Sequence, residues 1–132
     1  MKFRNIFFFL LVLGTTSCKT DINVFDYFDK TAPFNFHKKD SVLNITDLSG
    51  REISPGNAIY LDFVKWLENN KSGWQSTPAS FVSEAFIDQN NFRFLYLKDG
   101  SGVIIFIDKE NKVRQYSKLI KKGDLIFLTK EN

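Results

Sequence analysis

The sequence predicts an α+β fold, in which one long helix packs on an antiparallel meander of four to five strands with an N-terminal hairpin beside it. Three observations lead to this expectation. One segment near the middle of the chain has helical periodicity, with an apolar and a polar face. The segments after it are short apolar or alternating runs separated by turn residues, as in a meander. Aromatic residues make up 16% of the chain, and they supply the buried area that a small domain needs.

The first 17 residues have the three parts of a secretory leader. Lys2 and Arg4 give a positive start, residues 6–13 are an uninterrupted apolar run, and small polar residues follow up to Ser17. The run is too short to span a membrane, which takes about 20 apolar residues. A buried N-terminal helix is the alternative, but a run without a polar face makes a poor amphipathic helix. We therefore expect residues 1–17 to be a signal peptide.

Cys18, the single cysteine of the sequence, directly follows this leader. The stretch up to about Asp21 resembles the signal of bacterial lipoproteins, in which the cysteine becomes the first mature residue and carries acyl chains. Ser17 and Thr16 suit that pattern, whereas Thr15 stands where the family usually has Leu. A disulfide is the alternative, but the sequence has no second cysteine to form one. The resemblance implies lipidation of Cys18 and a membrane partner through the anchor. The polar stretch after the cysteine looks like the outer-membrane sorting signal of some lipoproteins, so we expect a place in the cell envelope, at the outer membrane.

Beyond the leader, we expect residues 18–40 to be a lipid-anchored tether and residues 41–132 to be a single α+β domain. The tether should pack partly on the domain, because a free linker would not carry four phenylalanines, namely Phe25, Phe28, Phe34 and Phe36. The net charge of +3 falls by two without the leader, because Lys2 and Arg4 lie in it. So small a charge excludes a strong case for nucleic-acid binding.

The first elements of structure fall in the tether and just after it. Residues 24–28 fit one helical turn, and Phe34 and Phe36 alternate with polar residues as in a strand. Residues 41–54 predict a hairpin around the turn sequence "DLSG", with Ile53 in its second strand.

The clearest helix lies between Ser54 and Gly73. Ser54 or Asn57 is suited to cap its N terminus, and Pro55 is tolerated in a first turn. We expect about four turns, with an apolar face made of Ile59, Tyr60, Phe63, Val64, Trp66 and Leu67.

Five strand-like runs follow this helix, at residues 80–88, 92–98, 103–107, 113–117 and 124–129. Tight turns between them indicate an antiparallel meander. Residues 103–107, "VIIFI", are apolar throughout, as expected of a central strand that is covered on both faces.

Catalytic arrangements are sparse in this sequence. His37 is the single histidine, and a surface position is its simplest interpretation. Glu84 would be a functional acid if it pointed inward, whereas an acid in an edge strand is more often solvated. The stretch "DKENK" has too few regularly spaced oxygen ligands for calcium and predicts a plain turn. We expect no catalytic residue, no metal and no cofactor, which leaves a small hydrolase as the least favoured function.

Two features suggest contact with a partner. Trp74 falls in a polar segment after the helix, and tryptophan is enriched at binding hot spots; the alternative is that it folds back over the core. Basic residues also gather near the C terminus, among them Lys118, Lys121 and Lys122, and would face an acidic partner or lipid headgroups unless they are simply solvated.

The leading functional hypothesis is a non-enzymatic protein-binding module on a lipid anchor, in the manner of an immunity or inhibitor lipoprotein. This rests on size, predicted location and missing chemistry, since no motif of the mature domain carries it. The alternative is an accessory or assembly subunit of a cell-envelope complex.

Overall fold

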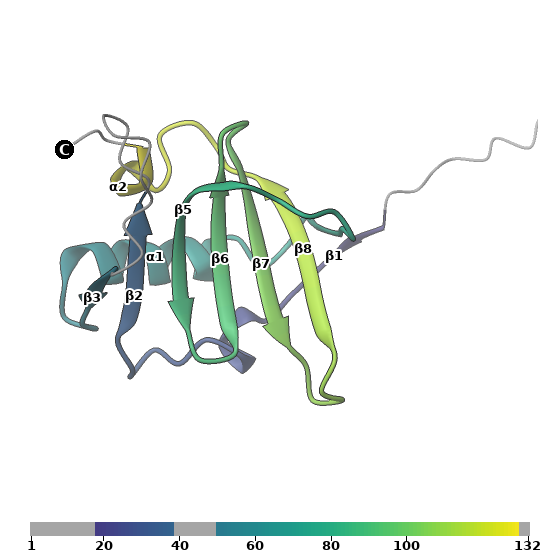
Figure 1. Ribbon diagram of the computed structural model, residues 1–132, viewed down its shortest axis with the longest axis horizontal. Coiled ribbons are helices and arrows are strands. Elements are labelled where there is room, and N and C mark those ends of the chain that lie inside the picture. The colour runs from purple at the N-terminus through teal and green to yellow at the C-terminus, as the bar shows by residue number, and fades with distance from the viewer. Residues whose placement is uncertain (1–17, 39–49, 130–132) are drawn as a thin grey trace, which may run out of the picture.

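The computed structural model describes residues 18–38 and 50–129, which build an eight-stranded antiparallel sheet with a helix against one face (Figure 1). The strands lie side by side in the order β1-β4-β8-β7-β6-β5-β2-β3. Their bounds are β1 Lys19–Thr20, β2 Phe34–Lys38, β3 Arg51–Ile53, β4 Trp74–Ser76, β5 Ser83–Gln89, β6 Phe92–Leu97, β7 Ser101–Ile107 and β8 Val113–Leu119. The helical segments are the 3₁₀ turn η1 Val24–Asp26, the helix α1 Ala58–Asn69 and the short helix α2 Ile126–Thr129.

The antiparallel sheet and the helix on it agree with the prediction, but the size of the sheet does not. The sheet has eight strands instead of four or five, so the fold is mostly β. The meander of β5, β6, β7 and β8 lies where the sequence placed it. Strands β1, β3 and β4 are only two or three residues long. Segments this short cannot show a period of two, and only their pairing partners define them as strands.

The chain crosses the sheet once on each face. Strand β3 is at one edge and β4 is next to the other, so α1 carries the chain across the sheet between them. Residues 77–82, here called the crossing segment, bring it back from β4 to β5 over the opposite face, in front of the sheet in Figure 1. The side chain of Gln115 in β8 donates from Nε2 to the carbonyls of Thr77 and Ala79, at 3.1 and 2.5 Å. We call the side against α1 the covered face.

Helix α1 begins as predicted and is shorter than predicted. The Asn57 side chain accepts a hydrogen bond from the Ile59 N–H at 2.9 Å, so Asn57 rather than Ser54 is the N-cap. Twelve residues make little more than three turns, instead of about four. The buried side chains of α1 all belong to the predicted apolar face and are Tyr60, Phe63, Trp66 and Leu67.

The core lies between α1 and the covered face and is largely aromatic. Phe63 contacts Phe28 and Phe94 edge-to-face, with ring centroids 5.8 and 5.2 Å apart. Phe34 of β2 stacks on Tyr60 at 4.9 Å. Such pairs add specific geometry to the area that the rings bury.

The segment predicted as a tether is built into the sheet and the core. Phe28 beside η1 is buried, and β2 lies between β5 and β3, inside the sheet. Gln89, only 5% exposed, holds the loop before β2. Its Oε1 accepts from the Asp29 N–H at 2.7 Å, and its Nε2 donates to the Asp29 and Ala32 carbonyls at 2.9 and 3.0 Å.

The structure corrects one predicted strand region, and most of another lies outside the described residues. Residues 124–129 form a turn and the helix α2, not a strand. The outer edge of β8 is already paired with β4, and positive φ angles at Gly123 and Leu125 turn the chain away from the sheet. Of the predicted hairpin, residues 41–49 lie outside the described residues, and Ile53 is in β3, which pairs with β2.

Candidate functional site

The predicted lipidation residue, Cys18, is exposed at the edge of the sheet. The next two residues form β1, in which Lys19 lies opposite Gln75 and Thr20 opposite Trp74 of β4. The sheet therefore starts one residue after the cysteine. Among the described residues there is no helix long and apolar enough to span a membrane.

Trp74 is part of the core and not of a binding surface. Its side chain is 0% exposed in β4, and its Nε1 donates to the Asn70 carbonyl at 2.7 Å. The ring meets Trp66 of α1 edge-to-face at 6.1 Å. This position agrees with the alternative that Trp74 folds back over the core, and it leaves the ring without exposed surface for a partner.

Lys118 lies beside Trp74 and is held in place. Its Nζ donates to the Ser72 carbonyl at 2.7 Å and is 6.0 Å from the centre of the Trp74 ring. Partial burial lowers the pKa of Lys118, and the positive charge of Lys19 lowers it further. Lys118 is thus near Lys19, at the start of the sheet.

Lys121 and Lys122 lie elsewhere on the surface. Both are exposed and line an open hollow of about 560 Å³. Its other walls come from the β6–β7 turn and the end of β8 and include Tyr96, Asp99 and Leu119. The three lysines predicted to bind a partner thus divide between two places.

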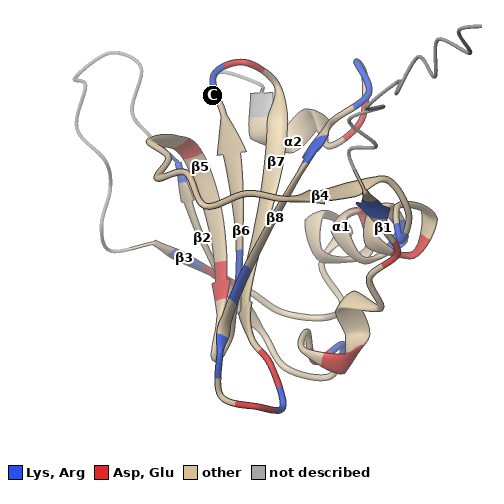
Figure 2. Cartoon of the chain, turned by 90° about the vertical axis from the view of Figure 1, so that its right-hand side faces the viewer, with Lys and Arg blue, Asp and Glu red and all other residues tan. Residues whose placement is uncertain are grey.

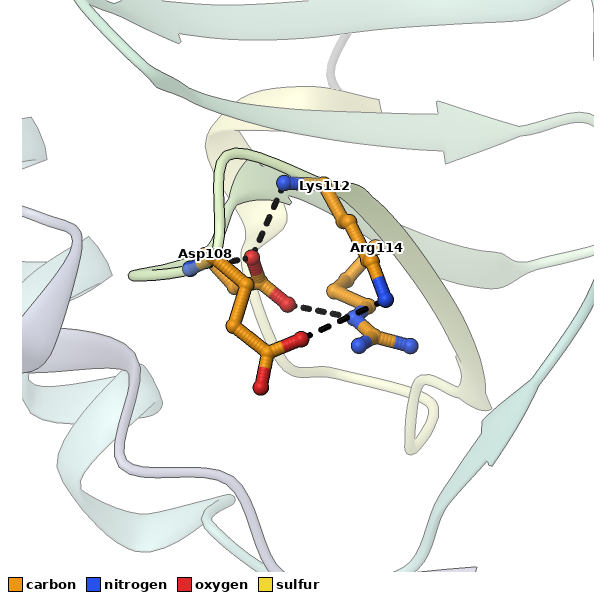
Figure 3. A network of polar contacts seen from close by, with 4 residues as sticks. Asp108, Lys112 and Arg114 are labelled. Carbon is orange, nitrogen blue, oxygen red and sulfur yellow. Dashed lines mark hydrogen bonds and ion pairs between the residues drawn. The ribbon is translucent and has the colours of Figure 1, made fainter.

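The turn "DKENK" is stabilised by Asp108, whose carboxylate is shown in Figure 3. The carboxylate accepts from the backbone N–H groups of Glu110 and Lys112, both at 2.9 Å, and from Arg114 Nε at 2.6 Å. These bonds, the one from Arg114 above all, lower the pKa of Asp108. The prediction of a turn at these residues is confirmed. The described residues contain no group of three or more His, Cys, Asp or Glu placed to hold a metal ion.

The side of the sheet opposite α1 is only partly covered among the described residues. Phe81 of the crossing segment packs there with Leu95, Leu97 and Val103. The other side chains of this face are half-buried or exposed: Phe86 and Ile105, which pack against this cluster, and Arg93, Ile107 and Val113 beyond it. We call these five residues the open face.

The open face combines apolar, aromatic and charged groups. Ile107 and Val113 face each other across β7 and β8 and are 37% and 69% exposed. The Arg93 guanidinium lies 5.2 Å from the centre of the Phe86 ring, and its Nε is 3.2 Å from Asp88 Oδ1. Residues 103–107 are therefore covered on both faces only at their start, which corrects the expectation for this strand.

Sequence reasoning missed the open face, although one signal pointed to it. Val113 is the sole apolar residue in the charged stretch from Asp108 to Arg114. Its side chain is 69% exposed, so it is not part of the core.

His37 and Glu84, the two residues considered for catalysis, lie in β2 and β5. The His37 ring stacks on Phe86 beside the open face, with centroids 4.3 Å apart. Glu84 is half-buried in β5, where a bulge interrupts the pairing with β6 between Ser83 and Ala85.

No protein-family model, no curated protein and no solved structure matches this chain.

Proposed function

We propose that this chain is a lipid-anchored, non-enzymatic protein-binding module of the cell envelope, acylated at Cys18. The observation that carries the proposal is the position of this cysteine. It is exposed, it follows the leader-like residues 1–17, and it is joined directly to the first strand. An exposed thiol at that junction is accessible for acylation. Two or three acyl chains make membrane attachment stable, whereas one gives only marginal binding.

The open face supports a protein as the partner of the module. Contiguous exposed apolar residues rimmed by polar ones are typical of protein–protein contact sites. Aromatic and arginine side chains, here Phe86 and Arg93, are the types enriched at such interfaces. An immunity or inhibitor protein that blocks a toxin or an envelope-degrading enzyme is the form of the proposal that we favour.

The anchor is tested by mass spectrometry of the chain recovered from bacterial membranes. We expect an N-terminal peptide that begins at Cys18 and carries acyl chains. The variant Cys18→Ser should lose the acyl mass and leave the lipoprotein-processing route. An unmodified thiol on protein recovered from the cytosol would contradict the proposal.

The partner is tested by crosslinking in intact cells, followed by capture of the full chain. Val113→Asp places a charge on the open face, and Leu61→Asp is the matched control on α1, since Leu61 is 59% exposed. We expect Val113→Asp to lose a partner that Leu61→Asp retains. A soluble toxin or hydrolase as that partner supports the inhibitor form, whereas an integral membrane protein supports the accessory-subunit alternative. Equal capture by both variants would remove the open face from the proposal.

A further inference from the structure

Three lysines lie on or near the β1 edge of the sheet, which begins directly after Cys18. Lys19 follows the cysteine in β1. The Lys71 carbonyl accepts a hydrogen bond from the Ile22 N–H at 2.7 Å, which joins residues 71–75 to the start of the chain, and Lys71 Nζ lies 5.8 Å from the centre of the Phe25 ring. Lys118 Nζ reaches the carbonyl of Ser72 in the same stretch. Figure 2 faces this side of the molecule and shows basic residues on β1 and β8. We call Cys18, Lys19, Lys71 and Lys118 the anchor edge.

The positive charge of the anchor edge is poorly neutralised by the protein. Within residues 18–38 and 50–129, none of its three lysines forms an ion pair. Glu68, at the end of α1, is 3.9 Å from Lys30 instead. Asp21 is the one acid between Cys18 and η1. Only β4 separates β1, which holds Lys19, from β8, which holds Lys118, and after burial the positive charge of Lys19 is a second cause of the lowered pKa of Lys118.

We propose that the anchor edge lies against the bilayer, with Lys19, Lys71 and Lys118 among anionic lipid headgroups. This inference rests on the proposed acylation of Cys18. Because β1 begins at the next residue, acyl chains on Cys18 leave no linker that would let the domain move away from the surface. A positive edge held within a Debye length of headgroups is attracted to anionic lipid. An acidic protein would have to compete with lipid for a surface that the anchor already holds at the membrane.

The consequence is a fixed orientation of the domain. β1 is at one edge of the sheet, and β3 is at the other. With the anchor edge on the membrane, the sheet stands edge-on, and the open face points sideways, accessible to a partner in the aqueous phase. Attachment then has two parts, acyl chains and lysines, of which only the second depends on salt and on lipid charge.

The test is amine footprinting of the full chain, purified from bacterial membranes and reconstituted in vesicles. One set of vesicles is phosphatidylcholine alone, and the other also contains phosphatidylglycerol. We expect a membrane-impermeant acylating reagent to label Lys19, Lys71 and Lys118 less on the anionic vesicles than on phosphatidylcholine alone. The typical attraction per lysine corresponds to a reduction of about fivefold or more. High salt should remove the difference. Lys65 and Lys109, both exposed, serve as internal controls and should be labelled equally on both.

A pair of variants separates lipid attraction from simple shielding by the bilayer. Lys19→Gln combined with Lys71→Gln should abolish the lipid-dependent protection of Lys118, whereas Lys65→Gln combined with Lys109→Gln should keep it. Equal labelling of anchor-edge and control lysines on anionic vesicles overturns the proposal. The acyl mass on Cys18 is read from the same samples, so an acylated chain with equal labelling refutes the orientation and leaves the anchor intact. An unmodified Cys18 refutes the anchor, and with it the basis of this inference.

Discussion

The two faces of the sheet are built from the same strands but are buried to different extents. On the covered face, alternate residues of β5, β6 and β7 meet α1 and are fully buried, as in Ile87, Phe94 and Ile104. On the opposite face, the crossing segment buries only a small cluster around Val103, and Ile107 and Val113 stay exposed. A helix seals a sheet face because its apolar stripe spans several strands, whereas a six-residue segment covers only a band.

This difference in burial predicts that substitutions on the two faces differ in their effect on stability. Side chains on the covered face are constrained by close packing, so substitutions there change the folding free energy. Ile107 and Val113 on the open face are exposed, so substitutions there should change the folding free energy little.

The largest effect should come from the covered face. Phe63→Ala removes a ring that is 0% exposed and that contacts Phe28, Phe34 and Phe94. We expect a loss of about 3–5 kcal/mol in unfolding free energy, measured by denaturant titration. Ile107→Ala on the open face is the control and should cost less than about 1 kcal/mol. Equal losses would remove the distinction between the faces.

Two glutamines sharpen the comparison, because one lies on each face. Gln89→Leu removes the buried amide that accepts from the Asp29 N–H and donates to the Asp29 and Ala32 carbonyls, and should cost about 1–3 kcal/mol. Gln115→Leu loses the bonds to Thr77 and Ala79 near solvent, where water can replace them, and should cost about 1 kcal/mol or less. Denaturant midpoints of the two variants give the order directly, and a larger loss for Gln115→Leu would contradict it.

A third effect depends on pH and belongs to the turn between β7 and β8. The pKa of Asp108 is lowered in the folded chain, chiefly by Arg114. Its stabilising contribution is therefore present above the unfolded pKa of about 3.9 and is lost as pH falls through the folded pKa. Arg114→Gln should make stability less dependent on pH in that acidic range, as measured by unfolding at a series of pH values. Lys65→Gln removes an equal charge elsewhere and should leave the dependence unchanged.

The smallest effect should be that of Val113→Ser. Val113 is 69% exposed, so its truncation should alter the unfolding free energy by no more than about 0.5 kcal/mol. The same change should weaken partner capture if the open face binds. A stability loss above 1 kcal/mol, by calorimetry or denaturant, would place Val113 in the fold rather than in the contact surface.

Much of the fold was predictable where the chain carries a long periodic signal. The apolar stripe of α1, with Phe63 and Trp66, and the alternation in β6 are local patterns that burial then follows. The short strands were not predictable in this way. The helix α2 was not predictable in this way either. Residues 124–129 have the sequence pattern of a strand, but β4 already pairs with the edge of β8 that they would need.

The candidate site shows the same division. Cys18 and the leader-like residues before it are a linear pattern, and their interpretation needs no structure. The sequence places Lys118 in a group of basic residues near the C terminus. Its closeness to Lys19 depends on the pairing of β1, β4 and β8. Trp74 shows the limit most clearly, since a polar sequence context suggested exposure and the fold buries it.

By itself, the sequence determined the elements that repeat over many residues, the leader pattern and the single thiol after it, because each is encoded by neighbours along the chain. Only the tertiary structure decided which face stays open, where Trp74 lies and which lysines gather beside Cys18. The physical reason is that exposure and charge proximity depend on strand pairing between segments far apart in sequence, and no local pattern records those pairings.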